Sequence, residues 1–576
     1  MSSNLEGISQ NDLQYNKNKI NPSGKKDEPS SNDSSNNISD EIIIQNKTDK
    51  NNSSESGLDD YDQNDTGIKK ICCFKINSEA DEQERLGAHP ALQTLLRQSL
   101  GPLCSQVVSS LYSIVDSFWV SHTIGADGLT ATGSVSLLEA INNAFGLYLL
   151  SCVSSRISYL FGQKRHEECA QVFVDIIRIS WIFSIILPII ILNICKPLTK
   201  WFGADEYIQE MGFQYMIPVT GLTIFYEMYQ ICCGLLQSEG LSWIYGVCQV
   251  CSLLLNMVCL DPLFLIAIKT PIWGASLASI IASALPMIII MTLIFKHKFT
   301  VKPTFKMFIH KFTPETKSAL KLGLSTLIEN LSANLPDIVI QKWLGNSGNA
   351  IGEYNVVISS WNVTIRIYMF IVCINNGIAQ GLLPTASFAF GARRLKRLRN
   401  LAFHALWIGT AWNALCEVIV ISCPRSLAKI WVKEKKFLDM TEKFFKNGFY
   451  CIVLAMFKLV SITTLQSCKK IVISIIQSIF TLLIPIPLFS TILYLTDKKN
   501  PPRLLFSFLI TDLLAFTITL VVIVVNLRFL FKKDPDNEID KYFPEANDKN
   551  EDESDYVNSS NDLSESKTSY EVPDEV

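Results

Sequence analysis

The chain has 576 residues, of which 48% are hydrophobic and only 18% are charged. Soluble proteins carry about a quarter charged residues, so this composition excludes a soluble multidomain enzyme and an intrinsically disordered protein. The 16 cysteines are too sparse for a secreted disulfide scaffold. Composition therefore indicates a membrane protein that crosses the bilayer several times.

Charge is distributed unevenly along the chain. Residues 1–88 contain 10 Lys or Arg and 17 Asp or Glu, and residues 534–576 contain 3 and 15. Because both segments have too little apolar surface to offset the entropy of ordering, we expect them to be disordered acidic tails. The remaining core has a net charge of about +16, and a basic excess in a membrane protein usually lies in cytoplasmic loops.

Apolar segments of about 20 residues, long enough to span a bilayer, recur between the two tails. About twelve segments qualify, six on each side of a basic linker at 297–314. An even number places both tails on one side, where the loops carry about 19 Lys or Arg against about 11 on the other side. We therefore predict that both termini are cytoplasmic. The segments are 91–120, 129–160, 170–195, 208–236, 242–268, 272–295, 315–344, 350–388, 400–423, 445–467, 470–495 and 503–530.

A weak internal repeat relates the two sets of spans. Ser158–Arg165 resembles Ser387–Arg394 at an offset of 229 residues. Leu236–Ser238 recurs as Leu465–Ser467 at the same offset. Each match lies at the end of a corresponding span, which indicates that the second half of the chain duplicates the first.

Six spans followed by six similar spans are typical of a duplicated transporter. We expect an all-α integral membrane protein with a first six-helix bundle at 89–296 and a second at 315–533. Rocking of one bundle against the other would give alternating access to a central cavity. The sequence contains no phosphate-binding loop, zinc-binding motif or nucleophile elbow, so we expect no ATP-driven transport, no enzyme activity and no metal site.

Several short motifs within these spans resemble those of one known family. They are Ile114–Val120 at the end of the first span, Leu260–Phe264 in the fifth, Gly274–Ser279 at the start of the sixth, and Gly377–Gly381 with Phe390–Ala392 in the eighth. In this order and spacing they resemble the multidrug and toxic compound extrusion (MATE) family over roughly residues 90–530. The run from Gly377 to Ala392 is most similar to the DNA-damage-inducible-type branch of that family.

The resemblance implies two six-helix bundles and an antiporter that exports organic, often cationic or amphipathic, compounds in exchange for H⁺ or Na⁺. It implies no cofactor beyond this coupling ion. Expected partners are small organic substrates and membrane lipids but no nucleic acid, and we expect a monomer in the plasma membrane or an internal vesicle. We interpret the Arg393–Arg399 run as an anchor on anionic lipid.

Other functions remain open at this point. One is transport of a lipid-linked or amphipathic metabolite, because wider relatives of the fold include flippases. An integral-membrane transferase and a receptor that transports nothing are further alternatives. The transferase would need a His or Asp-x-Asp constellation at the membrane face, and none is visible in the sequence.

Asp116 is the strongest candidate for a cation-coupling residue. It ends an apolar stretch of the first span, and an ionisable side chain within a span is costly, which favours a functional role. Burial favours the protonated form of a carboxyl group, so such a residue is suited to exchange a proton. The resemblance implies that Asp116 binds the coupling cation; the alternative is an Asp at the helix end that water reaches.

Asp261, in the fifth span, precedes Pro262. Members of the family often have an Asn four residues earlier, whereas here Asn256 lies five residues earlier. Asn256 is a candidate coupling residue. Because each residue turns an α-helix by about 100°, it would face Asp261 only if Pro262 distorts the turn. Ser279 matches the hydroxyl residue of the sixth-span motif, so the resemblance implies a cluster of Asp116, Asp261 and Ser279. The alternative for Asp261 is a helix cap.

Three further carboxylates and one proline within the spans are candidates for a role in transport. Glu329 in the seventh span is a candidate coupling residue, although the Glu of the family lies further along that span. Glu139 and Glu227 are candidates to face the cleft. Pro102 in the first span is a candidate hinge, since the resemblance implies that this helix bends there; a static kink is the alternative.

Overall fold

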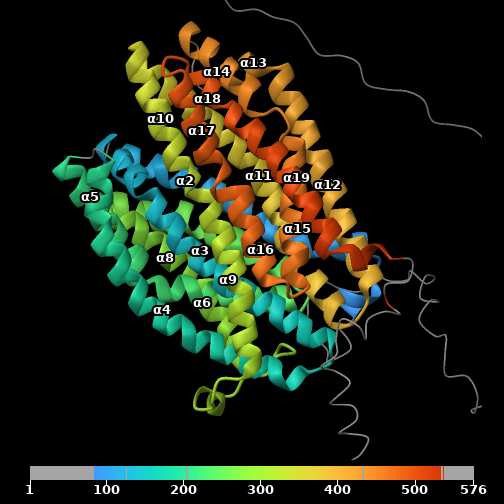
Figure 1. Ribbon diagram of the computed structural model, residues 1–576. Coiled ribbons are helices and arrows are strands. Elements are labelled where there is room, and N and C mark those ends of the chain that lie inside the picture. The colour runs from blue at the N-terminus through green and yellow to red at the C-terminus, as the bar shows by residue number, and fades with distance from the viewer. Residues whose placement is uncertain (1–83, 125, 203–204, 431–433, 533–535, 537–576) are drawn as a thin grey trace, which may run out of the picture. The chain divides into compact units, whose positions relative to one another are not determined.

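The structure is a computed structural model that describes residues 84–124, 126–202, 205–430, 434–532 and 536. All of these residues belong to one compact unit within Lys70–Val576. Within the described ranges the chain forms helices and no strands (Figure 1). The predicted acidic tails lie almost entirely outside the described residues.

The first half of the chain contains six long helical segments. The short π-helical turn η1 (Glu84–Ala88) precedes them, and the fourth segment bends by 49° between α5 and α6. The segments are α2 (Ala91–Thr123), α3 (Ala126–Gly162), α4 (His166–Trp201), α5 (Glu206–Gly221) with α6 (Thr223–Ser238), α7 (Ser242–Leu255) with η2 (Asn256–Leu260) and η3 (Pro262–Ala267), and α8 (Trp273–Phe295).

The second half repeats this plan after a linker that contains η4 (Phe305–Phe308). A bent pair recurs at the fourth segment, here by 44°, and a π-helical segment recurs at the fifth. The segments are α9 (Pro314–Asn334) with α10 (Pro336–Ile351), α11 (Tyr354–Gly391), α12 (Leu395–Ser422), α14 (Lys435–Gly448) with η5 (Ile452–Leu454) and α15 (Ala455–Ser467), α16 (Ile471–Ser478) with η6 (Ile479–Leu483) and α17 (Pro485–Thr496), and α18 (Pro501–Leu504) with α19 (Phe506–Asn526). Two short helices, α13 (Pro424–Ala428) and η7 (Arg528–Phe531), follow α12 and α19.

Ten of these twelve segments are recognisably membrane-spanning by length and composition. Among the described residues, eight helices are long and apolar enough to cross a bilayer, and the two bent pairs raise the number to ten. The other two, α2 and the α9–α10 pair, are more polar, but α2 packs on α7 and α11, and α9 packs on α3 and α16. Polar groups are tolerated in a span that faces other helices. The predicted all-α membrane fold is confirmed.

The two halves pack tightly where α3 meets α11, at the end of the molecule that carries the linker. A Cβ atom on Gly162 would overlap the carbonyl oxygen of Phe388, and one on Gly391 would overlap that of Tyr159. Both glycines belong to the repeated motif found in the sequence. Small residues allow such close helix contact within a membrane, so this motif closes the linker-side end between the halves.

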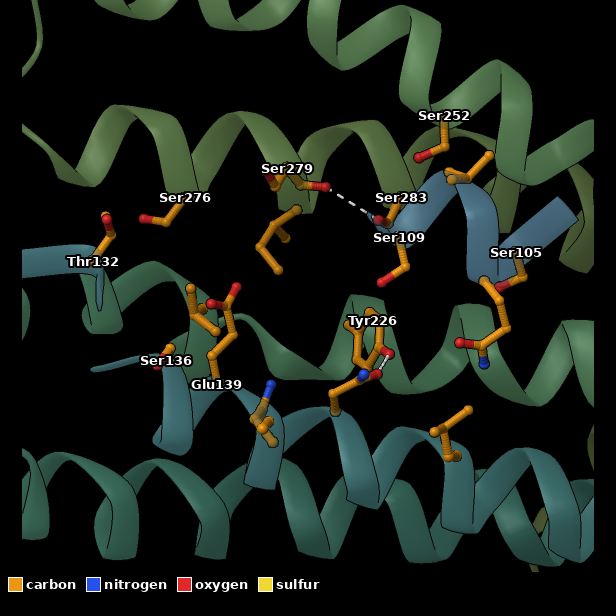
Figure 2. A pocket seen from close by; sticks show the side chains of 18 of the residues that line it. Ser105, Ser109, Thr132, Ser136, Glu139, Tyr226, Ser252, Ser276, Ser279 and Ser283 are labelled. Atoms are coloured by element: carbon orange, nitrogen blue, oxygen red, sulfur yellow. Dashed lines mark hydrogen bonds between the residues drawn. The ribbon is translucent and has the colours of Figure 1, made fainter. Parts of the chain in front are cut away.

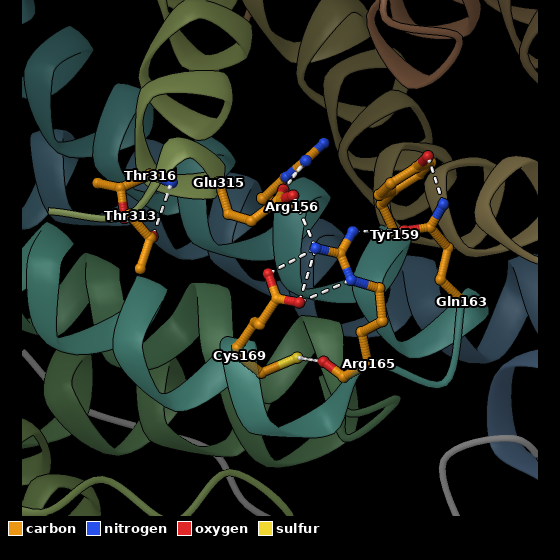
Figure 3. Close-up of polar contacts among 9 residues, drawn as sticks. Arg156, Tyr159, Gln163, Arg165, Cys169, Thr313, Glu315 and Thr316 are labelled. Atoms are coloured by element: carbon orange, nitrogen blue, oxygen red, sulfur yellow. Dashed lines mark hydrogen bonds and ion pairs between the residues drawn. The ribbon is translucent and has the colours of Figure 1, made fainter. Parts of the chain in front are cut away.

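An ion-pair cluster strengthens the same end (Figure 3). Glu315, in the first turn of α9, pairs with the buried Arg156 of α3 and accepts a hydrogen bond of 3.1 Å from Arg165. Arg165 also donates two hydrogen bonds, of 2.7 and 2.6 Å, to Glu168. Because Glu315 belongs to the second half and both arginines to the first, the cluster joins the halves.

The arginine run that we interpreted as a lipid anchor makes several intramolecular contacts, and its role as an anchor stays a prediction. Arg397 donates to the backbone carbonyls of His89 and Leu86 at 2.7 and 2.8 Å. Arg394 donates to the carbonyl of Gly87 at 3.2 Å, and Arg399 donates to that of Leu530 at 3.3 Å. These hydrogen bonds therefore hold both ends of the described chain against the N-terminal end of α12.

Candidate functional site

A cavity of about 760 Å³ lies mainly within the first half and is the candidate functional site (Figure 2). Helices α2, α3, α5, α6, α7 and α8 line it, and α11 contributes from the second half. Its volume lies in the range of small-molecule sites, about 300–1,000 Å³. On α3 its lining runs from Thr132 to Leu147, so the cavity lies away from the closed end near Gly162.

Many of the residues that line this cavity carry hydroxyl groups. Three tyrosines and two asparagines of the first half add aromatic and amide groups. Tyr226 donates a hydrogen bond to Asn143, and it accepts one of 2.7 Å from Gln230. The hydroxyl-bearing residues other than tyrosine are Ser105, Ser109, Thr132, Ser136, Ser252, Ser276, Ser279 and Ser283.

Two charged residues line the cavity among the residues that the structure describes, and they come from different halves. Glu139 lies on α3, and Tyr215 donates to its carboxylate at a long distance of 3.5 Å. Arg366 lies on α11. A ligand in the cavity therefore meets one negative and one positive group. Glu139 faces the cavity as predicted, whereas Glu227 is buried in α6 and is not part of the cavity wall.

Asn256 and Asp261 are not among the residues that line the cavity, and they contact each other directly. The amide nitrogen of Asn256 donates to a carboxylate oxygen of Asp261 at 3.0 Å, and both residues are fully buried. In a regular α-helix the two would not face each other, but the turn is distorted here, because η2 is π-helical. The backbone N–H of Asp261 bonds to the carbonyl of Asn256, and this bond between residues five apart stacks the two side chains.

The other predicted coupling residues come from three other helices. Ser279 of α8 lines the cavity, and both η2 and η3 pack against α8 and α2. Asp116 lies on α2, but its side chain is outside the described residues, so its role stays a prediction. Glu329 is on the second half, where Gln466 of α15 donates to it at 2.9 Å. Glu329 therefore does not join the first-half cluster.

Pro102 lies within α2, which continues through it as one helix. The preceding residue, Gly101, packs against the start of α7, where a Cβ atom would overlap the carbonyl oxygen of Ser242. Gly101 is therefore required for close packing in this conformation. The hinge role of Pro102 stays a prediction.

One buried charge pair was missed by the sequence reasoning. Lys458 of α15 donates to Asp512 of α19 at 3.0 Å, and the two side chains are 8% and 6% exposed. Each residue lies within an apolar span, which is a signal for a buried ionic group. The sequence could not show that they pair, because 54 residues separate them.

Comparison with known protein families identifies the group to which this fold belongs. The family model MatE matches residues 102–260 and 328–490, which together make up more than half of the chain. The chain belongs to the MatE family. The two matched segments fall in the two halves, in agreement with the internal repeat. Members of the MatE family are transporters and not enzymes, which excludes the membrane transferase.

Curated relatives include multidrug export proteins of staphylococci. The multidrug export protein MepA of Staphylococcus aureus (strain MSSA476) is 19% identical over 357 residues, which cover 61% of this chain and 76% of that protein. MepA of Staphylococcus haemolyticus (strain JCSC1435) is 21% identical over 348 residues, covering 59% and 73%.

Solved MATE structures have the same fold. A MOP superfamily transporter from Pyrococcus furiosus, described as having a binding pocket of reverse polarity, matches with a TM-score of 0.72 and 19% identity over 79% of this chain and 100% of that one. An outward-facing multidrug resistance MATE family transporter matches with a TM-score of 0.71 and 18% identity, covering 79% and 99%. These matches and the apolar helices establish a multi-pass membrane protein with the MATE fold.

Proposed function

We propose that this protein is a cation-coupled antiporter that exports organic compounds through the first-half cavity by alternating access. The observation that carries the proposal is the cavity itself, which is large enough for a small molecule and is bounded by both halves. Its MepA relatives are named multidrug export proteins, which favours drug-like substrates. Because the run from Gly377 to Ala392 resembles that branch most, we also propose that the protein belongs to the DNA-damage-inducible-type branch of the family.

The walls of the cavity favour an amphipathic organic cation. Glu139 supplies a carboxylate for a positive group, and the rings of Tyr215 and Tyr226 can stack on it. The many hydroxyl groups suit substrates of varied hydrogen-bonding pattern. A flippase of lipid-linked metabolites would be favoured by a basic lining for phosphates, yet Arg366 is the one basic residue among the described lining residues.

We assign cation coupling to the buried pair of Asn256 and Asp261. Asp261 offers a carboxylate to H⁺ or Na⁺, and the side-chain oxygen of Asn256 is buried and accepts no hydrogen bond from the described residues. Asp116 and Ser279 complete the proposed cluster from α2 and α8. Cation binding there would alter the packing of α2 and α8 against η2 and η3, and hence the cavity that α2 and α8 line. No cofactor beyond the coupling ion is required.

Alternating access requires the linker-side end to open. In the present conformation that end is closed by the contact between Gly162 and Gly391 and by the ion pairs of Glu315. This conformation therefore corresponds to one of the two main states of the transport cycle, in which the cavity lies away from the linker. We propose that the protein acts as a monomer with both termini cytoplasmic, in the plasma membrane or an internal vesicle.

Binding of an organic cation to the purified protein tests the assignment of the cavity. Ethidium fluorescence in detergent should report saturable binding, and Glu139→Gln should weaken it by about tenfold, the effect of losing one charged contact. Glu167→Gln, an exposed residue at the linker-side end, is the matched control and should leave binding unchanged. Equal affinity for the Glu139 variant and the control would refute the assignment.

A further inference from the structure

The linker between the two halves is held firmly against the first half. The backbone N–H groups of Val301 and Thr300 donate to the carboxylate of Glu239, at 3.0 and 3.3 Å. At the other end of the linker, the N–H of Thr313 donates to Asp175 at 3.2 Å. Both carboxylates are fully buried, so these contacts fix the ends of the linker.

The middle of the linker is fixed in the same way. The amide of Gln171 donates to the carbonyl of Met307 at 3.1 Å, and Arg178 donates to the carbonyl of His310 at 2.8 Å. Phe299 and Val301 are buried against the first half. The linker therefore has a defined inner face, and the residues on its other face are presented outward by a supported backbone.

This outward face carries apolar side chains that are unusually exposed. Ile309 is 88% exposed and Phe305 is 77% exposed, more than any other large apolar side chain among the described residues. Large apolar groups presented to water by a fixed backbone indicate a surface that another apolar phase covers.

The exposed face is continuous with the lipid-facing surface of two spans. Phe308 stacks on Trp181 of α4 with 5.6 Å between ring centroids, and Phe305 stacks on Phe295 at the end of α8 with 5.0 Å. Beyond Trp181, α4 exposes a run of isoleucines, including Ile182. Aromatic side chains gather where a membrane protein passes from the acyl chains to the headgroups, so the linker lies at that level.

The charge of the linker matches an anionic surface. Residues 296–313 contain five lysines and no Asp or Glu. Lys302, Lys306 and Lys311 are exposed on the segment that carries Phe305 and Ile309. Apolar side chains flanked by lysines are the pattern of an interfacial anchor, in which apolar groups enter the acyl boundary and ammonium groups meet lipid phosphates.

We propose that the linker is a binding site for anionic phospholipids of the leaflet on the linker side. Phe305 and Ile309 insert below the headgroups, and Lys302, Lys306 and Lys311 bind the headgroup phosphates. The leaflet is the cytoplasmic one in the predicted orientation. The site is independent of the transport cavity, so its failure would leave the proposed transport function intact.

Hydrogen–deuterium exchange of the full chain in lipid nanodiscs tests this site. One protein molecule per disc is compared in phosphatidylcholine alone and in phosphatidylcholine mixed with phosphatidylserine. We expect the amides of residues 304–312 to exchange more slowly in the anionic discs, and the difference to shrink as salt is raised. Equal exchange in the two discs would overturn the proposal.

Two variants separate the charge from the apolar contact. Each lysine near an anionic surface contributes about a fivefold change in affinity, so K302Q/K306Q/K311Q should abolish the dependence on phosphatidylserine, whereas F305S/I309S should speed exchange in both discs. K498Q/K499Q, in the exposed loop before α18, is the matched control and should change neither. A phosphatidylserine effect that survives the triple variant, or protection found only at protein concentrations that allow a second copy to bind, would overturn the proposal.

Discussion

Loss of one partner from the buried pair of Lys458 and Asp512 should destabilise the second half strongly. The two groups are 3.0 Å apart and almost fully buried. Their attraction is about 5 kcal/mol at an effective dielectric constant of about 20. Lys458→Met leaves the carboxylate of Asp512 buried without its cation, and breaking a buried pair in this way costs about 3–5 kcal/mol.

The exposed pair of Lys196 and Glu210 provides the matched control. Its atoms are 2.6 Å apart, but the side chains are 47% and 50% exposed. Because water and salt screen exposed pairs, Lys196→Met should cost less than about 1 kcal/mol. The same substitution at two similar distances therefore compares a buried ion pair with an exposed one.

Unfolding of the purified variants in detergent, followed by the midpoint of thermal denaturation, measures both effects. We expect a clear drop for Lys458→Met and almost none for Lys196→Met. The double variant with Lys458→Met and Asp512→Leu should recover most of the loss, because two matched apolar side chains leave no buried charge. Equal midpoints for the two single variants, or a double variant that is less stable than Lys458→Met, would refute the reasoning.

Three further predictions concern the closed end and the coupling pair. Gly391→Ala places a methyl group against the Tyr159 carbonyl, so it should weaken the closure of the linker-side end. A cysteine placed at Ser155 should then be alkylated more readily, and unchanged labelling would contradict this. Glu315→Gln removes the carboxylate that pairs with the buried Arg156, and a loss of about 3–5 kcal/mol is expected by thermal denaturation. A loss below about 1 kcal/mol would show that the pair is screened. Asn256→Ala removes the hydrogen bond to the Asp261 carboxylate, and a hydrogen bond to a charged group is worth about 1.5–3 kcal/mol. The variant should therefore shift the cation concentration for half-maximal transport. An unchanged value would show that Asn256 is not part of the coupling site.

Much of the fold follows from hydropathy, because the membrane requires long apolar helices. The limits of hydropathy appear at α2 and at the α9–α10 pair. Both were predicted as apolar spans, but they are more polar than the other ten segments, and other helices shelter their polar side chains. The repeated glycine motif was visible in the sequence, but its role in closing one end was not. Only the folded backbone shows that Gly162 and Gly391 face each other's helices.

The candidate site was predicted less completely than the fold. The prediction for Asn256 rested on α-helical spacing, with Pro262 as the one signal that this spacing could fail, and the sequence does not show that η2 is π-helical. Glu139 was predicted because a carboxylate within a span is rare, but Arg366, which lines the same cavity from the second half, was not among the predicted site residues. Contacts between distant segments set these positions, and a single sequence does not contain them.

Gradient-driven transport by the protein in reconstituted vesicles tests the central claim of cation-coupled export most directly. Movement of a fluorescent organic cation is followed under an imposed H⁺ or Na⁺ gradient, for the intact chain and for Asp261→Asn, Asp116→Asn and the exposed control Glu167→Gln. The account predicts transport driven by one of the two gradients, retained in the control and lost in the Asp261 and Asp116 variants. Transport by the intact chain that ignores both gradients, or that persists unchanged in both aspartate variants, would contradict it.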